Sequence, residues 1–163
     1  MSRFRAIMHT KAGRLLLVLS PLLLVALFFC LPGQAPAAHA ASVSCGSLGS
    51  LIESDNFYSN GTKIGELDVY YNGSTGNNCA YTRSGGPTWG VSKSMLVQIQ
   101  ACAQTSPSPN CNAIAWDQDD GNYSYYAGPV GVHGQGHCIF ASGEMNWNGH
   151  LYYTSTNGAS HCR

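Results

Sequence analysis

Two histidines four residues apart, His133 and His137, are the first candidates for chemistry in this chain. Zinc proteases place such a pair on one face of a helix, with a glutamate between them as the base. Here two glycines and a glutamine separate the histidines, so the sequence predicts a turn with both side chains exposed. His150 and His161 could join a zinc site, but nothing in their spacing requires one, and we expect no cofactor.

A run of acids, Asp117, Asp119 and Asp120, suggests a second kind of ion site. An EF-hand loop needs glycine at its sixth position and glutamate at its twelfth. Counted from Asp117, those positions hold Asn122 and Gly128, so the EF-hand pattern fails. The Asp-Gly pair instead favours an acidic hairpin turn, and an irregular calcium site over residues 117–120 is the alternative.

Acids that could hydrolyse sugars are also present. Glu66 and Asp68 alternate along one strand face, about 7 Å apart, but such a pattern is typical of a solvated face. Glu144 has no acidic partner in the sequence. The chain contains neither a G-x-S-x-G nor an S-x-x-K motif, so we expect a protein that is not an enzyme. The alternative is a small extracellular hydrolase that combines Glu144 with one of three residues: His133, His137 or Asp119.

Aromatic residues are the positive feature of the sequence. All nine tyrosines and three tryptophans follow residue 40, and several occur as Tyr-Tyr pairs. In such a pair on a strand, one ring faces the core and the other faces solvent. Exposed rings among Asn, Gln, Ser and Gly suit the binding of polysaccharide or protein, although aromatics are also common in strands for packing alone. The predicted binding residues are Tyr70, Trp89, Tyr126, Trp147 and Tyr152.

Short alternating segments predict the elements that carry these residues. In residues 94–102, Met95, Val97, Ile99 and Ala101 fall on one face, which is the period of a half-buried strand. Glycine and asparagine recur too often for long helices, and only residues 48–58 form a mild helix candidate. We therefore expect an all-β domain, a small antiparallel sandwich or barrel. Its predicted strands are residues 65–71, 79–83, 94–102, 112–116, 123–130, 137–142 and 150–155.

The cysteines indicate disulfides. Cys30 lies in the leader described below, which leaves six cysteines, an even number in a domain of about 120 residues. Fifteen pairings are open to six cysteines, and we favour pairing between neighbours. The turn-forming TSPSPN segment makes the second pair the firmest of the three predicted bridges: Cys45–Cys79, Cys102–Cys111 and Cys138–Cys162.

Residues 1–40 predict a signal peptide. Four basic residues precede an apolar run at residues 15–31, and small residues follow at positions 38 and 40. The run is short for a span and contains Pro21, so we expect no stable membrane anchor. Residues 41–163 then form a single secreted domain with four basic and eight acidic residues, a net charge of −4. This charge argues against nucleic-acid binding.

Three features together resemble a known family. They are GELDVYYNGSTGNNCA (residues 65–80), YYAGPV (residues 125–130) and the cysteine order from Cys45 to Cys162. They are similar to those of the small secreted actinobacterial proteins named spore-associated proteins. The resemblance implies an exported β domain at the spore or cell surface, and it brings no catalytic residues.

The sequence thus favours a secreted, non-enzymatic domain that binds cell-surface polysaccharide or protein through an aromatic, Asn- and Gly-rich surface. A secreted protease inhibitor is an alternative, because the Pro-rich loop between Cys102 and Cys111 has the character of a constrained loop that resists cleavage. The extracellular hydrolase described above is the third hypothesis.

Overall fold

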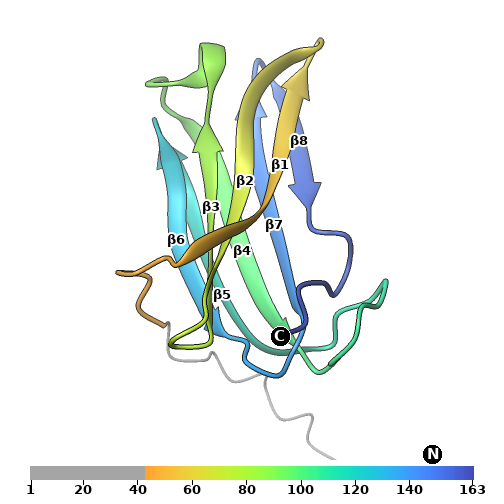
Figure 1. The fold of residues 1–163 in the computed structure, drawn as a ribbon. Coiled ribbons are helices and arrows are strands. Elements are labelled where there is room, and N and C mark those ends of the chain that lie inside the picture. The colour runs from red at the N-terminus through yellow and green to blue at the C-terminus, as the bar shows by residue number, and fades with distance from the viewer. Residues whose placement is uncertain (1–42) are drawn as a thin grey trace, which may run out of the picture. The chain divides into compact units, whose positions relative to one another are not determined.

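The computed structural model describes residues 43–163, and its regular elements are strands and one short 3-10 turn. The predicted signal peptide and Cys30 lie outside the described residues. Within residues 43–163, no helix has the length and apolar character needed to span a bilayer. The elements along the chain (Figure 1) are β1 Ser50–Ser59, β2 Thr62–Asn72, β3 Asn77–Ser84, η2 Gly86–Thr88, β4 Lys93–Cys102, β5 Ala113–Tyr123, β6 Tyr126–His133, β7 Ile139–Trp147 and β8 His150–Ser155.

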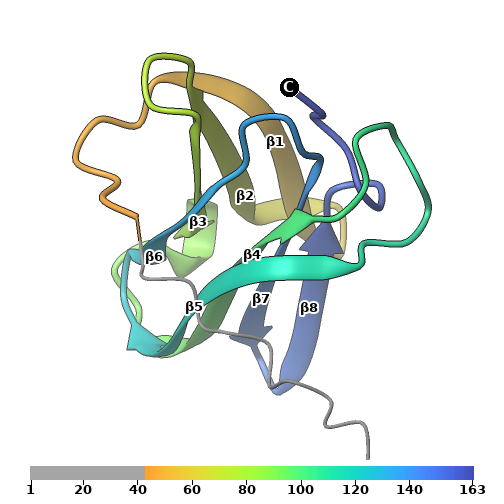
Figure 2. The same cartoon turned by 90° about the horizontal axis from the view of Figure 1, so that it is seen from below.

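The strands form two antiparallel sheets, which confirms the predicted all-β class. One sheet has the order β1-β2-β3-β6 and the other has the order β5-β4-β7-β8. Figure 2, which looks along the strands, shows the two sheets facing each other. The β5 and β6 edges lie together, but no backbone ladder joins them. Of the two predicted architectures, the molecule is therefore the sandwich and not the barrel.

The core lies between the sheets and follows the period-two pattern of the strands. On β4, the four apolar residues of the alternating segment are all at most 1% exposed, whereas Gln98 and Gln100 are half-exposed. On β2, Leu67 and Val69 are fully buried on the inner face. Each such side chain stabilises the fold by about 1.5–3 kcal/mol through burial. The alternation therefore also fixes which residues of each strand reach the outer surface of the sandwich.

Two local predictions were wrong, and pairing with a neighbouring strand explains both. The mild helix candidate at residues 48–58 is mostly β1, which pairs antiparallel with β2. The expected acidic turn is instead the second half of β5, which continues in register with β4 from Val97↔Asp119 to Lys93↔Tyr123. In both segments, a partner strand supplies the backbone hydrogen bonds that decide the conformation, and local propensity is overridden.

The carboxylates of β5 close one edge of the sandwich. Gly128 and Gly131 on β6 donate backbone N–H groups to Asp119 and Asp117, at 2.7 and 2.9 Å. Asp119 also accepts a hydrogen bond from the Tyr123 hydroxyl at 2.6 Å. Side chains of one sheet thus satisfy edge amides of the other, where no backbone ladder is present. These acids have a structural role, and their carboxylates are already engaged.

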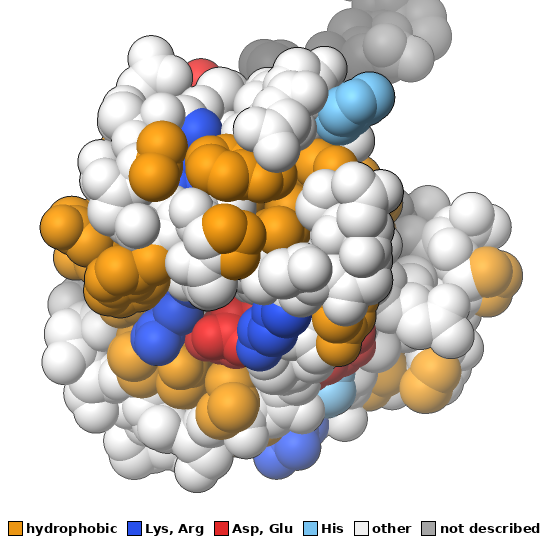
Figure 3. Space-filling view, turned by 90° about the horizontal axis from the view of Figure 1, so that it is seen from above, with side chains coloured by type: hydrophobic (Ala, Val, Ile, Leu, Met, Phe, Trp, Pro, Cys, Tyr) orange, Lys and Arg blue, Asp and Glu red, His pale blue; other side chains and the backbone are white. Residues whose placement is uncertain are grey.

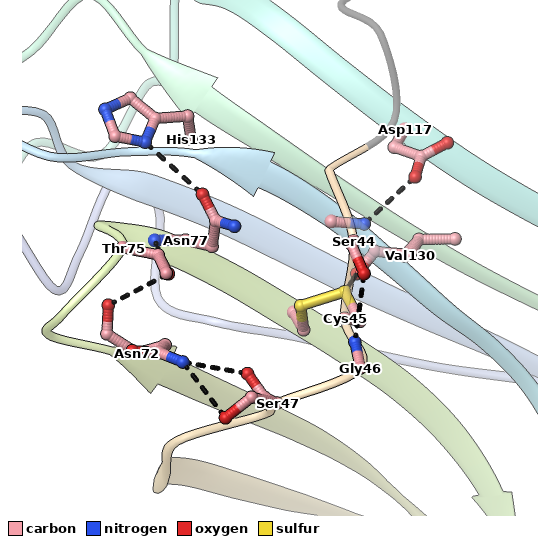
Figure 4. Close-up of a disulfide and its surroundings, with 12 residues drawn as sticks. Ser44, Cys45, Gly46, Ser47, Asn72, Thr75, Asn77, Asp117, Val130 and His133 are labelled. Carbon is pink, nitrogen blue, oxygen red and sulfur yellow. Dashed lines mark hydrogen bonds between the residues drawn. A yellow bond between two sulfur atoms is a disulfide. The ribbon is translucent and has the colours of Figure 1, made fainter.

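All three predicted disulfide pairings are confirmed. Figure 4 shows the first, in which Cys45 holds the segment before β1 against Cys79 of β3, over the outer face of the sheet. Three bridges of this kind typically contribute about 2–4 kcal/mol each. They indicate that the domain acquires its structure in an oxidising environment.

Candidate functional site

A groove with aromatic walls lies on the outer face of the β1-β2-β3-β6 sheet. Its volume is about 280 Å³, close to the lower end of the ~300–1,000 Å³ typical of small-molecule sites. We call it the aromatic groove, and it is lined by Tyr81, Arg83, Trp89, Tyr125 and Tyr126. These residues come from β3, from the loop after η2, from the turn that leads into β6 and from the first residue of β6.

Strand pairing places the inner side of the groove. On β3, Ala80 and Thr82 point into the core, so Tyr81 and Arg83 point outward. Tyr126 of β6 pairs directly with Arg83 across the ladder. The Tyr81 and Tyr126 rings meet edge to face, with centroids 5.7 Å apart and an interplanar angle of 81°. This arrangement is the favourable one for neighbouring rings, and it leaves ring surface open to a ligand.

Trp89 and Tyr125 form the outer wall of the groove. Their ring centroids lie 4.9 Å apart, and the Trp89 side chain is 60% exposed. The backbone N–H of Gly90 donates to the Ser124 carbonyl at 3.0 Å, which ties the two loops together. A large apolar ring with this exposure is available for contact with a partner.

A buried lysine fixes the loop that carries Trp89. The Lys93 ammonium donates to the Thr88 and Val91 carbonyls, at 3.0 and 2.7 Å. The Thr88 hydroxyl in turn donates to the Ile64 carbonyl at 2.6 Å. Burial lowers the pKa of Lys93, since a charged group loses its hydration there. The backbone that carries the tryptophan is thus held in place before any ligand arrives, which reduces the entropy cost of binding.

The groove contains one charged group, Arg83, and a buried carboxylate neutralises it. Arg83 Nε lies 3.2 Å from Asp68 Oδ2, and Arg83 Nη2 donates to the Tyr70 hydroxyl at 3.2 Å. The guanidinium carbon is 5.1 Å from the Tyr81 ring centroid. Asp68 is only 4% exposed, and burial raises its pKa, against the lowering effects of Ser54 and Arg83. The prediction that Asp68 belongs to a solvated face was therefore wrong, because this carboxylate is buried beside Arg83.

A second ion pair, Lys63 with Glu66, lies on the same strand as Asp68. In the space-filling view (Figure 3), basic and acidic side chains adjoin one another between patches of hydrophobic side chains. On the paired strands β2 and β3, the two described basic residues, Lys63 and Arg83, each have an acidic partner. The surface beside the groove therefore has little net charge. The site therefore offers rings and hydrogen-bonding groups, and no strong electrostatic attraction.

The structure brings three of the five predicted binding residues together. Trp89 and Tyr126 line the groove, and Tyr70 adjoins it, with its ring centroid 6.1 Å from that of Tyr81. Trp147 and Tyr152 lie elsewhere and pack against the core cluster. Tyr152 also shares a hydrogen bond with Ser59 Oγ at 2.6 Å, so these two rings are not part of the groove.

Three groove residues were missed by the sequence reasoning. Tyr81 and Arg83 alternate in the predicted strand 79–83, and that alternation could have placed both on the outer face beside Tyr70. For Tyr125 and Tyr126, the sequence predicted that one ring faces the core and the other faces solvent. Both rings are exposed, because β6 begins only at Tyr126 and Tyr125 precedes the strand. No local pattern indicates that Arg83 meets Asp68.

The residues considered for metal binding and catalysis do not converge. Among residues 43–163, no group of three His, Cys, Asp or Glu side chains could hold a metal ion. His133 is exposed and contacts Asn77 Oδ1 at 3.3 Å, whereas His137 is half-buried, so only one of the two is exposed as predicted. His150 is exposed on β8, and Glu144 is half-buried on β7.

A different acidic cluster was not anticipated from the sequence. Glu53 and Asp55 of β1 lie near His161, which forms an ion pair with Glu53. Burial, followed by the neighbouring Glu53, raises the pKa of Asp55 from 3.8 to about 6. Asp55 Oδ2 is buried and has no hydrogen-bond partner among the described residues. The cluster joins the C-terminal segment to β1, and its signal in the sequence is only two acids at alternate positions.

The described residues therefore define a disulfide-linked antiparallel β-sandwich with an aromatic groove on one outer face. No protein-family model, curated protein or solved structure matches this chain. What the groove can bind follows from its own residues.

Proposed function

We propose that this protein is a secreted, non-enzymatic domain of the spore or cell surface that binds neutral polysaccharide in the aromatic groove. The observation that carries the proposal is the combination of four aromatic walls with an arginine whose charge is already balanced by Asp68. Pyranose rings have an apolar C–H face, which packs against an aromatic ring, and a rim of hydroxyls, which need hydrogen-bonding partners.

The charge of the site supports a neutral ligand. A cation such as a quaternary ammonium group would gain from the rings, but it would find no free carboxylate there, since Asp68 is already paired with Arg83. An anionic polymer would gain little from an arginine paired with Asp68 at 3.2 Å, and residues 41–163 have a net charge of −4. Sugar hydroxyls can accept hydrogen bonds from the guanidinium and exchange them with the tyrosine hydroxyls.

The three disulfides and the predicted signal peptide support an extracellular location. The protein recovered from the culture medium should begin at Ala41 and contain no free thiol. N-terminal sequencing and thiol titration under denaturing conditions measure both properties. An intact leader on protein found inside the cell would contradict secretion.

Binding is tested with the exported protein on a glycan array of paired neutral and uronic-acid oligosaccharides, and by co-sedimentation with purified bacterial cell walls. The binding signal should appear on the neutral glycans of the array. Trp89→Ala and Tyr126→Ala should each weaken binding about tenfold or more, in line with the ~1–2 kcal/mol of aromatic anchor residues. Tyr153→Ala, an equally exposed ring on β8 of the other sheet, is the matched control. Unchanged binding by both groove variants would exclude the groove as the site.

A protein ligand and protease inhibition are the competing functions. The inhibitor hypothesis needs a loop whose backbone is free to enter a protease, but Ser108 in the Cys102–Cys111 loop exchanges two backbone hydrogen bonds with Ala159. This pairing argues against the loop as an inhibitory segment. Slowing of extracellular proteases by the purified protein would revive that hypothesis.

A further inference from the structure

A second pocket lies at the outer face of the other sheet. Its volume is about 460 Å³, and its lining combines one aromatic ring and a proline with side-chain amides and contains no charged residue: Gln100, Pro109, Asn110, Cys111, Asn112, Phe140 and Gly158. We propose that this pocket is a second, independent site for neutral saccharide, and that the protein therefore cross-links polysaccharide chains. The ligand class rests on the proposed function.

The loop that carries the asparagines is held rigidly. The Cys102–Cys111 disulfide closes it at its base. At its tip, Ser108 and Ala159 exchange backbone hydrogen bonds at 3.1 and 2.8 Å. The backbone N–H of Asn112 donates to the Gln104 side chain at 3.0 Å. Three separate restraints thus position Asn110 and Asn112.

One amide of the pocket, that of Gln100, is oriented by a chain of hydrogen bonds along the sheet. Gln118 Nε2 donates to Asp120, Gln98 Nε2 donates to Gln118 at 3.2 Å, and Gln100 Nε2 donates to Gln98 at 3.0 Å. Gln100 lines the pocket, and its Oε1 accepts no hydrogen bond from the described residues. Within the described residues, the side-chain amides of Asn110 and Asn112 make no hydrogen bond, so their donors and acceptors are open to a ligand.

This lining selects the same ligand class as the groove by a different route. Uncharged amides pair with hydroxyl groups in both directions, and the half-buried Phe140 ring offers an apolar surface. A charged ligand would find no counter-charge in the lining. A saccharide satisfies both the amides and the ring, whereas an apolar ligand would leave the amides unpaired.

The position of the two sites makes the domain bivalent. Tyr81 and Arg83 point outward from β3 of one sheet, whereas Gln100 and Phe140 point outward from β4 and β7 of the other. The two sheets pack face to face, so the sites open on opposite sides of the sandwich. Two polysaccharide chains held in this way become linked, and an insoluble wall binds with avidity above that of either site.

The test uses the exported protein with sonicated cell-wall fragments, and it measures both co-sedimentation and fragment clustering by turbidity. The variants are Trp89→Ala for the groove, Phe140→Ala and Asn112→Ala for the pocket, and Tyr153→Ala as the control. Asn112 is exposed, so its variant keeps the pocket test valid if Phe140→Ala fails to fold. Light scattering checks that the protein is a monomer, because a dimer would cluster fragments through the groove alone.

Wild type and Tyr153→Ala should cluster the fragments. Each groove or pocket variant should still sediment with the walls, about tenfold more weakly, and should lose clustering. Clustering by Asn112→Ala equal to that of wild type would overturn the second site and leave the groove intact. Sedimentation abolished by Asn112→Ala and unchanged by Trp89→Ala would overturn the proposed groove function and bivalency together, and leave the pocket as the only site.

Discussion

Replacing Asp55 by asparagine should stabilise the protein at neutral pH and have little effect at acidic pH. Asp55 lies on β1, and its buried Oδ2 has no hydrogen-bond partner in the described part of the chain. Burial and the adjacent Glu53 raise its pKa from 3.8 to about 6, although His161 acts in the opposite direction. The ionised side chain is therefore unfavourable in the folded state.

The size and pH range of the effect follow from this pKa. A pKa that is higher in the folded state means that folding takes up a proton between about pH 4 and pH 6. The stability that protonated Asp55 contributes is complete below pH 3.8 and is lost as the pH rises through about 6. At 1.36 kcal/mol per pKa unit, the upper limit is about 3 kcal/mol. The side chain is only half-buried, and solvent screening should reduce the gain to about 1–2 kcal/mol.

The assay is urea unfolding followed by tryptophan fluorescence at pH 4.0 and pH 7.5, with the disulfides intact. Asp55→Asn should raise the free energy of unfolding at pH 7.5 and match wild type at pH 4.0. Asp120→Asn, an exposed acid on β5, is the control and should change stability by less than about 0.5 kcal/mol at either pH. A gain of equal size at both pH values would refute the titration argument, as would a loss at pH 7.5.

Three further predictions concern the groove, the pocket loop and the N-terminal bridge. Lys93→Met should lower the free energy of unfolding by about 2 kcal/mol, because two carbonyls lose their donor, and should weaken glycan binding through Trp89; denaturant titration and the array measure the two effects. Replacing Cys102 and Cys111 by serine should cost about 3 kcal/mol for a loop with a separation of nine residues, and unchanged hydrogen exchange in residues 103–110 would contradict the restraint. Gly131→Ala places a Cβ 2.7 Å from Cys45 Sγ, so it should lower the free energy of unfolding by at least about 1 kcal/mol. An unaltered melting temperature would argue against this close contact.

Local sequence patterns were sufficient to predict much of the fold. The alternation in residues 94–102 predicted β4 and its buried face, since a period of two is a property of the strand itself. Neighbour pairing of the cysteines was also correct. The Cys102–Cys111 bridge spans a short turn, whose ends stay close in any compact conformation. The β4 and Cys102–Cys111 predictions depend on residues close together in the chain, whereas the other two bridges join cysteines 34 and 24 residues apart.

The tertiary structure alone decided the candidate site. Residues 50–59 form a strand because they pair with β2. β5 extends through its acidic residues because it stays paired with β4 along that stretch. The groove draws on three separate segments, and its charge is set by the contact of Arg83 with Asp68, fifteen residues earlier on the neighbouring strand. Sequence spacing determines which face of a strand a side chain occupies, but only strand order and register determine which side chains meet across that face.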